Sequence, residues 1–114
     1  METNFFGTIA LTKCVMPVMI KQKQGHIIVI SSIAGKFGFY LRSAYSASKH
    51  ALHGFFESVR MELYNDNIKV LLVCPEKVKT NMSYNAIKAD GSKHDVMDKS
   101  HENGVSAEQC AKEI

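Results

Sequence analysis

The sequence contains no tryptophan, two prolines and only two arginines, Arg42 and Arg60, among its 14 basic residues. With so little proline and only seven glycines in 114 residues, collagen-like and low-complexity chains are excluded. The 46% of hydrophobic residues is typical of an ordinary globular chain. The formal net charge of +3 is small, and arginine is the residue that phosphate recognition favours. The composition therefore predicts no nucleic-acid partner.

Cysteine is scarce as well. There are three, Cys14, Cys74 and Cys110, and none of them forms the C-x-x-C spacing of a zinc site. We expect Cys14 and Cys74, which lie in apolar segments, to be small buried residues, in a reducing, cytoplasmic compartment. One polar stretch contains four histidine and aspartate residues that could bind a metal but lack a recognised spacing, so no metal site is predicted. These residues are His94, Asp95, Asp98 and His101.

Long hydrophobic runs are absent too. Runs such as Ile27–Ile30 are far shorter than the roughly 20 residues that a membrane-spanning helix needs. The first four residues carry no basic side chain of the kind that opens a signal peptide. We therefore expect no membrane segment in these residues.

Hydrophobic periodicity predicts two long helices. In the first, Phe5–Lys23, Pro17 is expected to break or kink the helix, and Gly25 to end it. The strongest helical pattern is Ser43–Tyr64. Its predicted apolar stripe consists of Ala44, Ala47, Ala51, Leu52, Phe55, Val59 and Leu63. The residues predicted only to pack are Phe5, Phe6, Phe55 and Phe56, and those expected on the helix surface are His50 and His53.

Two continuous β-branched runs, His26–Ser32 and Ile68–Cys74, are typical of parallel strands covered on both faces. A loop over residues 33–42 and the long helix connect them into one βαβ unit. After a polar stretch over residues 82–104, Ser106 opens a last helix with a capping box. Because two parallel strands are too few for a stable sheet, we expect an α/β fold in which this chain is half of a larger domain.

Three residues form a candidate site, and one of them, Ser32, falls where open parallel sheets bind ligands. Ser32 stands at the carboxyl end of the first strand, and Tyr45 and Lys49 lie one turn apart at the start of the long helix. An ammonium beside a phenol favours the phenolate, so such a pair can act as a general acid/base near neutral pH. The Ser32 hydroxyl could hydrogen-bond a substrate oxygen.

A Tyr-x-x-x-Lys pair alone is a weak pattern, because a tyrosine and a lysine one turn apart are most often part of a solvated helix face. The context strengthens the functional interpretation. Ser32 ends a strand, a glycine-bearing loop follows, and Tyr45 comes 13 residues later.

With these residues identified, the chain resembles the short-chain dehydrogenase/reductases. The resemblance rests on GHIIVISSIAG at residues 25–35 and SAYSASKHAL at residues 43–52, and covers nearly the whole chain. It is strongest to the branch called dehydrogenase/reductase member 7-like. The resemblance implies a partial Rossmann-like, doubly wound parallel sheet. Residues 1–114 would be the catalytic half of one domain, whose dinucleotide-binding amino-terminal half is absent.

The resemblance also implies roles for single residues. Tyr45 would be the catalytic acid/base, Lys49 would assist it and bind the nicotinamide ribose, and Ser32 would orient the substrate oxygen. Asn4, in an Asn-x-x-Gly pattern that ends at Gly7, would be a fourth catalytic residue that supports a water-linked proton relay to the lysine. The alternative for Asn4 is a helix-capping residue, a position that asparagine favours.

The family motif Pro-Gly-x-Val-x-Thr has its counterpart in residues 75–80, where Glu76 replaces the glycine. A glycine often serves a close backbone approach or unusual dihedral angles, so Glu76 is a departure from the motif. The glycine-rich phosphate-binding turn, and the residue that selects NAD or NADP, are not found in these residues. The cofactor-binding residues that the resemblance implies are Tyr45, Lys49, Pro75, Val78 and Thr80.

We therefore expect an NAD- or NADP-dependent oxidoreductase of the carbonyl reductase or alcohol dehydrogenase type, inactive as these 114 residues alone. The resemblance implies a small carbonyl or alcohol substrate, a substrate lid over residues 82–104, and a homodimer or homotetramer. The alternative is a non-enzymatic relative that keeps its dimer helices and acts as an interaction module. Glu76 and the missing parts of the domain favour this alternative, whereas the intact Ser32, Tyr45 and Lys49 argue against it.

Overall fold

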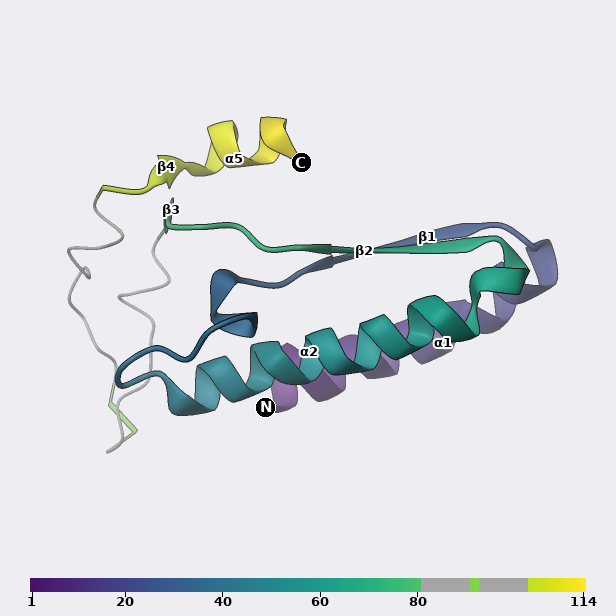
Figure 1. The fold of residues 1–114 in the computed structure, drawn as a ribbon, viewed down its shortest axis with the longest axis horizontal. Coiled ribbons are helices and arrows are strands. Elements are labelled where there is room, and N and C mark those ends of the chain that lie inside the picture. Colours follow the sequence, from purple (N-terminus) through teal and green to yellow (C-terminus); the bar gives the residue numbers. More distant parts are fainter. Residues whose placement is uncertain (81–90, 93–102) are drawn as a thin grey trace. The chain divides into compact units, whose positions relative to one another are not determined.

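The computed structural model describes residues 1–80, 91–92 and 103–114. The chain consists of two units, Met1–Cys74 and Pro75–Ile114. The first unit holds two long helices and a parallel pair of strands, and the second holds two short strands and a short helix (Figure 1). The strand–helix–strand order expected from the sequence lies within the first unit.

The first helix does not break at its proline. After a short π-helical stretch, η1 (Glu2–Phe6), the helix α1 (Gly7–Gln22) continues through Pro17, so the predicted break is wrong. Proline removes one backbone N–H from the helix ladder. The turns on either side are held because Met16 and Met19 pack against the core, and such tertiary packing supplies most helix stability in proteins.

Lys23 rather than Gly25 ends α1. Its backbone takes the left-handed conformation at φ 54°, and its N–H donates to the carbonyl of Ile20 at 3.2 Å. Gly25 instead begins strand β1 (Gly25–Ile30), where an added Cβ would lie 2.7 Å from the sulfur of Met19. The glycine therefore permits close packing of the strand against the helix.

The predicted pair of parallel strands is confirmed. β1 pairs with β2 (Ile68–Val73) in parallel, with Gly25 opposite Ile68 and Ile30 opposite Val73. The helix α2 (Ser43–Glu62) connects the two strands. Both long helices lie on the same face of this small sheet (Figure 1).

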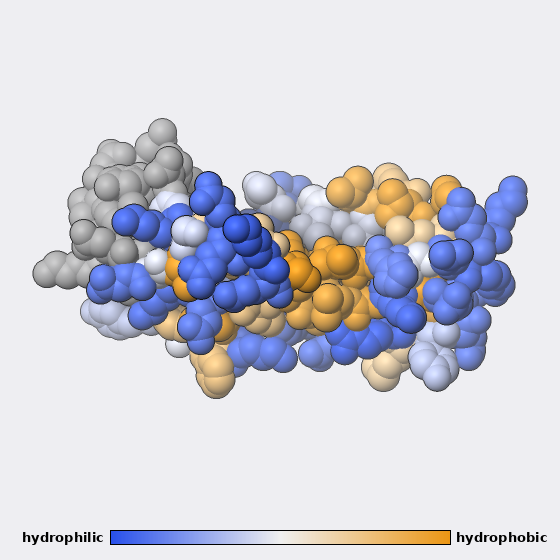
Figure 2. Space-filling view, turned by 90° about the horizontal axis from the view of Figure 1, so that it is seen from above, coloured by the Kyte–Doolittle hydropathy of each residue, from blue (hydrophilic) through white to orange (hydrophobic). Residues whose placement is uncertain are grey.

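The two faces of the sheet differ in burial. Ile27 and Val29 are buried on the face that the helices cover. On the opposite face Ile28, Ile30 and Leu71 are each more than half exposed, and hydrophobic side chains gather over its middle (Figure 2). Among the described residues, helices therefore cover one face of the sheet, whereas the sequence predicts strands that are covered on both faces.

The buried stripe of α2 differs in part from the predicted one. Ala44 and Ala47 are exposed, whereas the small polar side chains of Ser46 and Ser48 are buried. Alanine offers little apolar area, so the bulky Phe56, which is 0% exposed, decides which face of the helix turns inward. The residues that are buried as predicted are Leu52, Val59 and Leu63.

Phenylalanine rings connect the start of the chain to α2. Ring centroids lie 6.3 Å apart between Phe5 and Phe55 and 5.1 Å apart between Phe55 and Phe56, both in edge-on geometry. Phe6 lies in edge contact with Phe5. The prediction that these residues pack is therefore confirmed for Phe5, Phe55 and Phe56, whereas Phe6 is 52% exposed. Edge-on geometry is the favoured arrangement for aromatic pairs.

The turns that follow the two helices are joined. Lys23, just after α1, forms an ion pair with Asp66 in the 3-10 turn η3 (Tyr64–Asp66). The side-chain amide of Asn67 donates to the carbonyl of Lys23 at 3.2 Å. These contacts hold the starting ends of β1 and β2 next to each other.

The three cysteines are free thiols. Cys14 is exposed on α1, so the expectation of a buried residue is wrong there, because Thr12 rather than Cys14 occupies the inward face of that turn. Cys74 and Cys110 are half-buried.

The second unit confirms the predicted helix cap. Strand β3 (Val78–Lys79) pairs in parallel with β4 (Val105–Ser106), and the helix α5 (Ala107–Glu113) follows. The Ser106 hydroxyl accepts a hydrogen bond from the N–H of Gln109 at 3.1 Å. Most of the polar stretch over residues 82–104 lies outside the described residues.

One helical stretch in the described part of the chain, Glu2–Gln22, has the length and apolar composition of a membrane span. This stretch contains no long unbroken hydrophobic run, because polar residues such as Thr8 and Thr12 interrupt it. Core helices of globular proteins can have the same length and composition, and Met16, Met19 and Ile20 of this helix pack against the core.

Replacing Pro17 with alanine restores an N–H that can donate to the carbonyl of Lys13, and the Pro17 side chain is exposed, so little packing is lost. We expect the free energy of unfolding to rise by about 1–3 kcal/mol, since proline costs roughly 3 kcal/mol relative to alanine inside a helix. Urea unfolding followed by circular dichroism measures the change. The control Val18→Ala, which keeps its N–H, should shift stability by less than about 0.5 kcal/mol. A less stable Pro17→Ala variant would contradict the prediction.

Candidate active site

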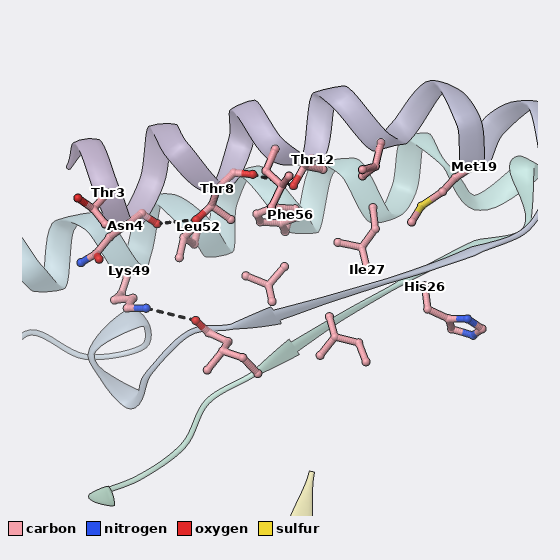
Figure 3. Close-up of a pocket in the computed structure, with 15 residues that line it drawn as sticks. Thr3, Asn4, Thr8, Thr12, Met19, His26, Ile27, Lys49, Leu52 and Phe56 are labelled. Carbon is pink, nitrogen blue, oxygen red and sulfur yellow. Dashed lines mark hydrogen bonds between the residues drawn. The ribbon is translucent and has the colours of Figure 1, made fainter. Parts of the chain in front are cut away.

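Tyr45 and Lys49 stand one turn apart at the start of α2, and both are half-buried. The Lys49 ammonium lies 5.8 Å from the centroid of the Tyr45 ring. It donates a hydrogen bond to the carbonyl of Ile30, at the carboxyl end of β1, at 3.2 Å (Figure 3). Burial lowers the pKa of Lys49 from its ordinary value. The lysine therefore joins the helix to the end of the strand and keeps its positive charge close to the phenol ring.

Ser32 lies two residues beyond the end of β1, at the start of the 3-10 turn η2 (Ile33–Gly35), which packs against α2. Its side-chain oxygen accepts a hydrogen bond from the N–H of Ala34 at 3.2 Å. A hydroxyl has one hydrogen to donate in addition to its acceptor sites. The capping contact therefore fixes the Ser32 oxygen and leaves its hydrogen for another acceptor.

Asn4 lies inside η1, and its side chain reaches α2. Its amide nitrogen donates to the Ser48 hydroxyl at 3.3 Å, and that hydroxyl donates to the carbonyl of Tyr45 at 2.7 Å. Neither η1 nor α1 is capped by a side-chain hydrogen bond, so the helix-capping alternative for Asn4 is wrong. The structure instead holds Asn4 against the turn of α2 that carries Tyr45 and Lys49.

A cavity of about 480 Å³ lies between α1, β1 and α2, in the first unit. Asn4 and Lys49 line it at the same end (Figure 3), and apolar side chains such as Met19 and Phe56 line the rest. Ser32 and Tyr45 are not among its lining residues. Of the four residues predicted as catalytic, the cavity thus brings together Asn4 and Lys49.

Pro75, Val78 and Thr80, predicted to bind the cofactor, belong to the second unit, where Val78 lies in β3. Their role stays a prediction. Glu76, which replaces the family glycine, is exposed. Its backbone does not take a positive φ, which among the described non-glycine residues occurs at Lys23, Leu41 and Asn67. Local backbone conformation therefore does not require a glycine at this position.

His53 is buried, with 6% exposure, so the prediction of a helix-surface residue is wrong. Its Nε2 lies 3.0 Å from the Ser31 hydroxyl oxygen and 3.6 Å from the Cys74 sulfur. A Cβ on the buried Gly35 would lie 2.6 Å from the His53 ring, so the absence of a side chain makes room for the imidazole. His50, on the same helix, is exposed as predicted.

The spacing of His53 in the sequence indicates that it shares a helix face with Tyr45 and Lys49. It follows Lys49 by four residues, as Lys49 follows Tyr45, and residues with this spacing share a helix face. The predicted apolar stripe excluded it because histidine is polar. Burial, followed by the nearby Lys36 charge, lowers the pKa of His53 below its ordinary value of 6.5. The imidazole is therefore neutral at neutral pH.

Residues 1–80, 91–92 and 103–114 contain no group of three or more His, Cys, Asp or Glu side chains that could hold a metal ion. The four histidine and aspartate residues of the polar stretch lie outside the described residues. They are His94, Asp95, Asp98 and His101.

Comparison with known proteins identifies clear relatives. A sequence model of the family described as short chain dehydrogenase matches residues 1–91. The chain is 49% identical over all 114 residues to the protein named dehydrogenase/reductase SDR family member 7B from Mus musculus. It is 44% identical over the same length to dehydrogenase/reductase SDR family protein 7-like from Drosophila melanogaster. In both cases it covers 35% of the relative's length, so the chain spans about a third of these curated relatives.

Solved structures agree with the fold class. A short-chain dehydrogenase from Streptomyces avermitilis is 39% identical and has a TM-score of 0.64 over 68% of this chain and 28% of its own. A second structure, ElxO with NADP bound, is 34% identical with a TM-score of 0.67, over 69% of this chain and 32% of its own. The expected α/β, Rossmann-type fold class is confirmed.

The buried, neutral His53 predicts how stability depends on pH. Between its lowered pKa and 6.5 the unfolded chain binds more protons than the folded one, so the free energy of unfolding falls as the pH falls through this window. Denaturant unfolding at a series of pH values measures this slope. The His53→Gln variant, which cannot titrate, should lose the corresponding part of the slope, and His50→Gln should keep it. Equal slopes for His53→Gln and the unsubstituted chain would contradict the prediction.

Proposed function

The chain belongs to the short-chain dehydrogenase family, and on this premise we propose that it carries the catalytic residues of an oxidoreductase that acts on carbonyl and alcohol groups. Because the chain spans 35% of its mouse relative, the proposed activity is that of the protein that contains these residues. The observation that carries the proposal is the Lys49 ammonium beside the Tyr45 ring, held at the end of the strand that leads to Ser32.

Tyr45 is the proposed acid/base. In the reducing direction its hydroxyl proton passes to the carbonyl oxygen as hydride reaches the carbonyl carbon, which gives an alcohol and a phenolate. The Lys49 charge, 5.8 Å from the ring centroid and half-buried, stabilises that phenolate more strongly than it would in bulk water. Oxidation runs the same transfers backwards, and the phenolate takes the proton of the alcohol.

Ser32 is the proposed substrate-binding residue. Its oxygen is held by the N–H of Ala34, so its hydrogen can donate to the carbonyl oxygen of a substrate. A donor fixed in this way favours the charge that develops on the oxygen during reduction. The role matches the position of Ser32 beyond the end of a parallel strand, where ligands of open α/β sheets bind.

The proposed cofactor is NAD or NADP, which supplies or accepts the hydride when bound. The Lys49 ammonium fits this group, because it has three hydrogens and, among the described residues, its one protein acceptor is the Ile30 carbonyl. The remaining hydrogens could bind the ribose hydroxyls. Pro75, Val78 and Thr80 are the proposed contacts to the nicotinamide, and the NADP-bound ElxO structure, 34% identical to this chain, supports this choice of cofactor.

Asn4 is proposed to support proton exchange with solvent. It shares a cavity of about 480 Å³ with Lys49, which is large enough to hold ordered waters. Its side chain is fixed through Ser48 to the carbonyl of Tyr45. Asn4 and Lys49 together can therefore position water that restores the Tyr45 proton after each turnover.

The alternative function, a non-enzymatic interaction module, is favoured by one observation. α1 carries large apolar side chains that are exposed, Leu11 by 68% and Val18 by 55%, and apolar surface of this kind marks association sites. A homodimer or homotetramer is proposed for the enzyme too, so oligomeric state alone does not separate the two functions. Measurable turnover distinguishes an enzyme from an interaction module.

The three free thiols support the proposed reducing, cytoplasmic location.

Tyr45→Phe tests the proposed acid/base. In the protein that contains this chain, kcat should fall by about 10²–10⁴-fold, because phenylalanine has no proton to transfer. The loss of NADPH absorbance with a panel of aldehydes and ketones measures turnover. Tyr64→Phe is the matched control, because Tyr64 is 79% exposed beyond the other end of α2, and it should turn over normally. Unchanged turnover by Tyr45→Phe would contradict the proposal.

Cofactor binding should need more than these residues, because no glycine-rich phosphate-binding turn is found in them. We expect a fluorescence titration of the isolated 114-residue chain with NADPH to show no saturable binding. The same titration of the protein that contains the chain, at the length of its relatives, should saturate. Saturation by the isolated chain would show that these residues are sufficient for cofactor binding.

A further inference from the structure

His53 contacts the ends of both long strands. From the middle of α2, its Nε2 approaches the Ser31 hydroxyl at 3.0 Å, directly after β1, and the Cys74 sulfur at 3.6 Å, directly after β2. The two strand ends also bond to each other, because the N–H of Ser31 donates to the carbonyl of Val73 at 2.7 Å. One buried polar side chain thus joins three elements at a single point.

These contacts are next to the candidate catalytic residues. Ser31 precedes Ser32, and Tyr45, Lys49 and His53 follow one another at single-turn spacing on one helix. The Tyr45 and Lys49 side chains are therefore fixed to α2, and Ser32 is fixed to the end of β1. A contact between α2 and Ser31 sets the distance between these two halves of the candidate site.

Close packing and the contact of Nε2 with Ser31 hold the imidazole in place. Gly35, in η2 beside Ser32, leaves no room for a Cβ next to the ring. His53 Nδ1 is buried and has no hydrogen-bond partner among the described residues, and the Glu57 carboxylate is 3.9 Å away. With its hydrogen on Nδ1, toward Glu57, the neutral ring presents Nε2 as an acceptor to the Ser31 hydroxyl.

We propose that His53 is a positioning residue for the reaction: by binding Ser31 from the catalytic helix, it sets the Ser32 hydroxyl at the correct distance from Tyr45. This inference rests on the proposed function. It assigns His53 no contact with substrate or cofactor. Loss of the Nε2 acceptor releases Ser31 and allows Ser32 to shift, and a misplacement of about 1 Å in an active site can cost on the order of 100-fold in rate.

The test compares variants of the protein that contains this chain, with turnover followed by NADPH absorbance. His53→Leu keeps much of the volume but removes the acceptor, and should lower kcat about tenfold or more with the KM for NADPH unchanged. His53→Gln, whose amide oxygen can accept from Ser31, should keep kcat within about threefold. Ser31→Ala removes the partner hydroxyl with a smaller change of volume and should lower kcat as His53→Leu does. His50→Leu, on the exposed face, is the control.

A double-mutant cycle separates positioning from a general structural role. If His53 acts through Ser32, then adding His53→Leu or Ser31→Ala to Ser32→Ala should lower kcat little further, because the positioned group is already gone. Additive losses would overturn the proposal, as would normal kcat in folded Ser31→Ala. These failures are distinct from failure of the proposed function, which would appear as unchanged turnover in Tyr45→Phe.

Discussion

The hydrogen bond from the Lys49 ammonium to the carbonyl of Ile30 connects the helix that carries Tyr45 to the end of the first strand. A lysine at this point must lose part of its hydration, and burial lowers its pKa accordingly. The carbonyl at the strand end compensates in part by accepting one of its hydrogens. The candidate chemistry depends on this arrangement, because the same side chain that braces the helix against the sheet also places a positive charge beside the phenol ring.

The same region depends on small and polar residues rather than on apolar packing. Ser48 links Asn4 to the first turns of α2, and Gly35 makes room for His53. Ser46, Ser48 and His53 are all buried. Buried polar groups are costly unless they are hydrogen-bonded. Their presence between the start and the middle of α2, where they alternate with the core residue Leu52, indicates a requirement for placement rather than for stability.

Much of the fold could be predicted from the sequence, because the strands and helices follow local patterns. The two β-branched runs, the long helix and the Ser106 cap all form where expected. Features that depend on tertiary contacts could not be predicted. Pro17 stays helical because the half-buried Met16 and Met19 on either side pack against the core, and His53 faces inward because Gly35 leaves room for it. For the candidate site, the spacing of Tyr45 and Lys49 predicts their proximity. The partner of Asn4, Ser48, lies 44 residues away in the chain, and no local pattern indicates it.

The exposed face of the sheet has a consequence for handling the molecule. Ile28, Ile30 and Leu71 are more than half exposed, and on the same face the exposed Lys69, two residues before Leu71, supplies a positive charge. Within the described residues, β1 and β2 pair only with each other, so each also has a free edge. Unpaired strand edges beside apolar surface are where polypeptides aggregate by β-augmentation. When produced by itself, the 114-residue chain will need a solubilising fusion partner or detergent to remain monodisperse.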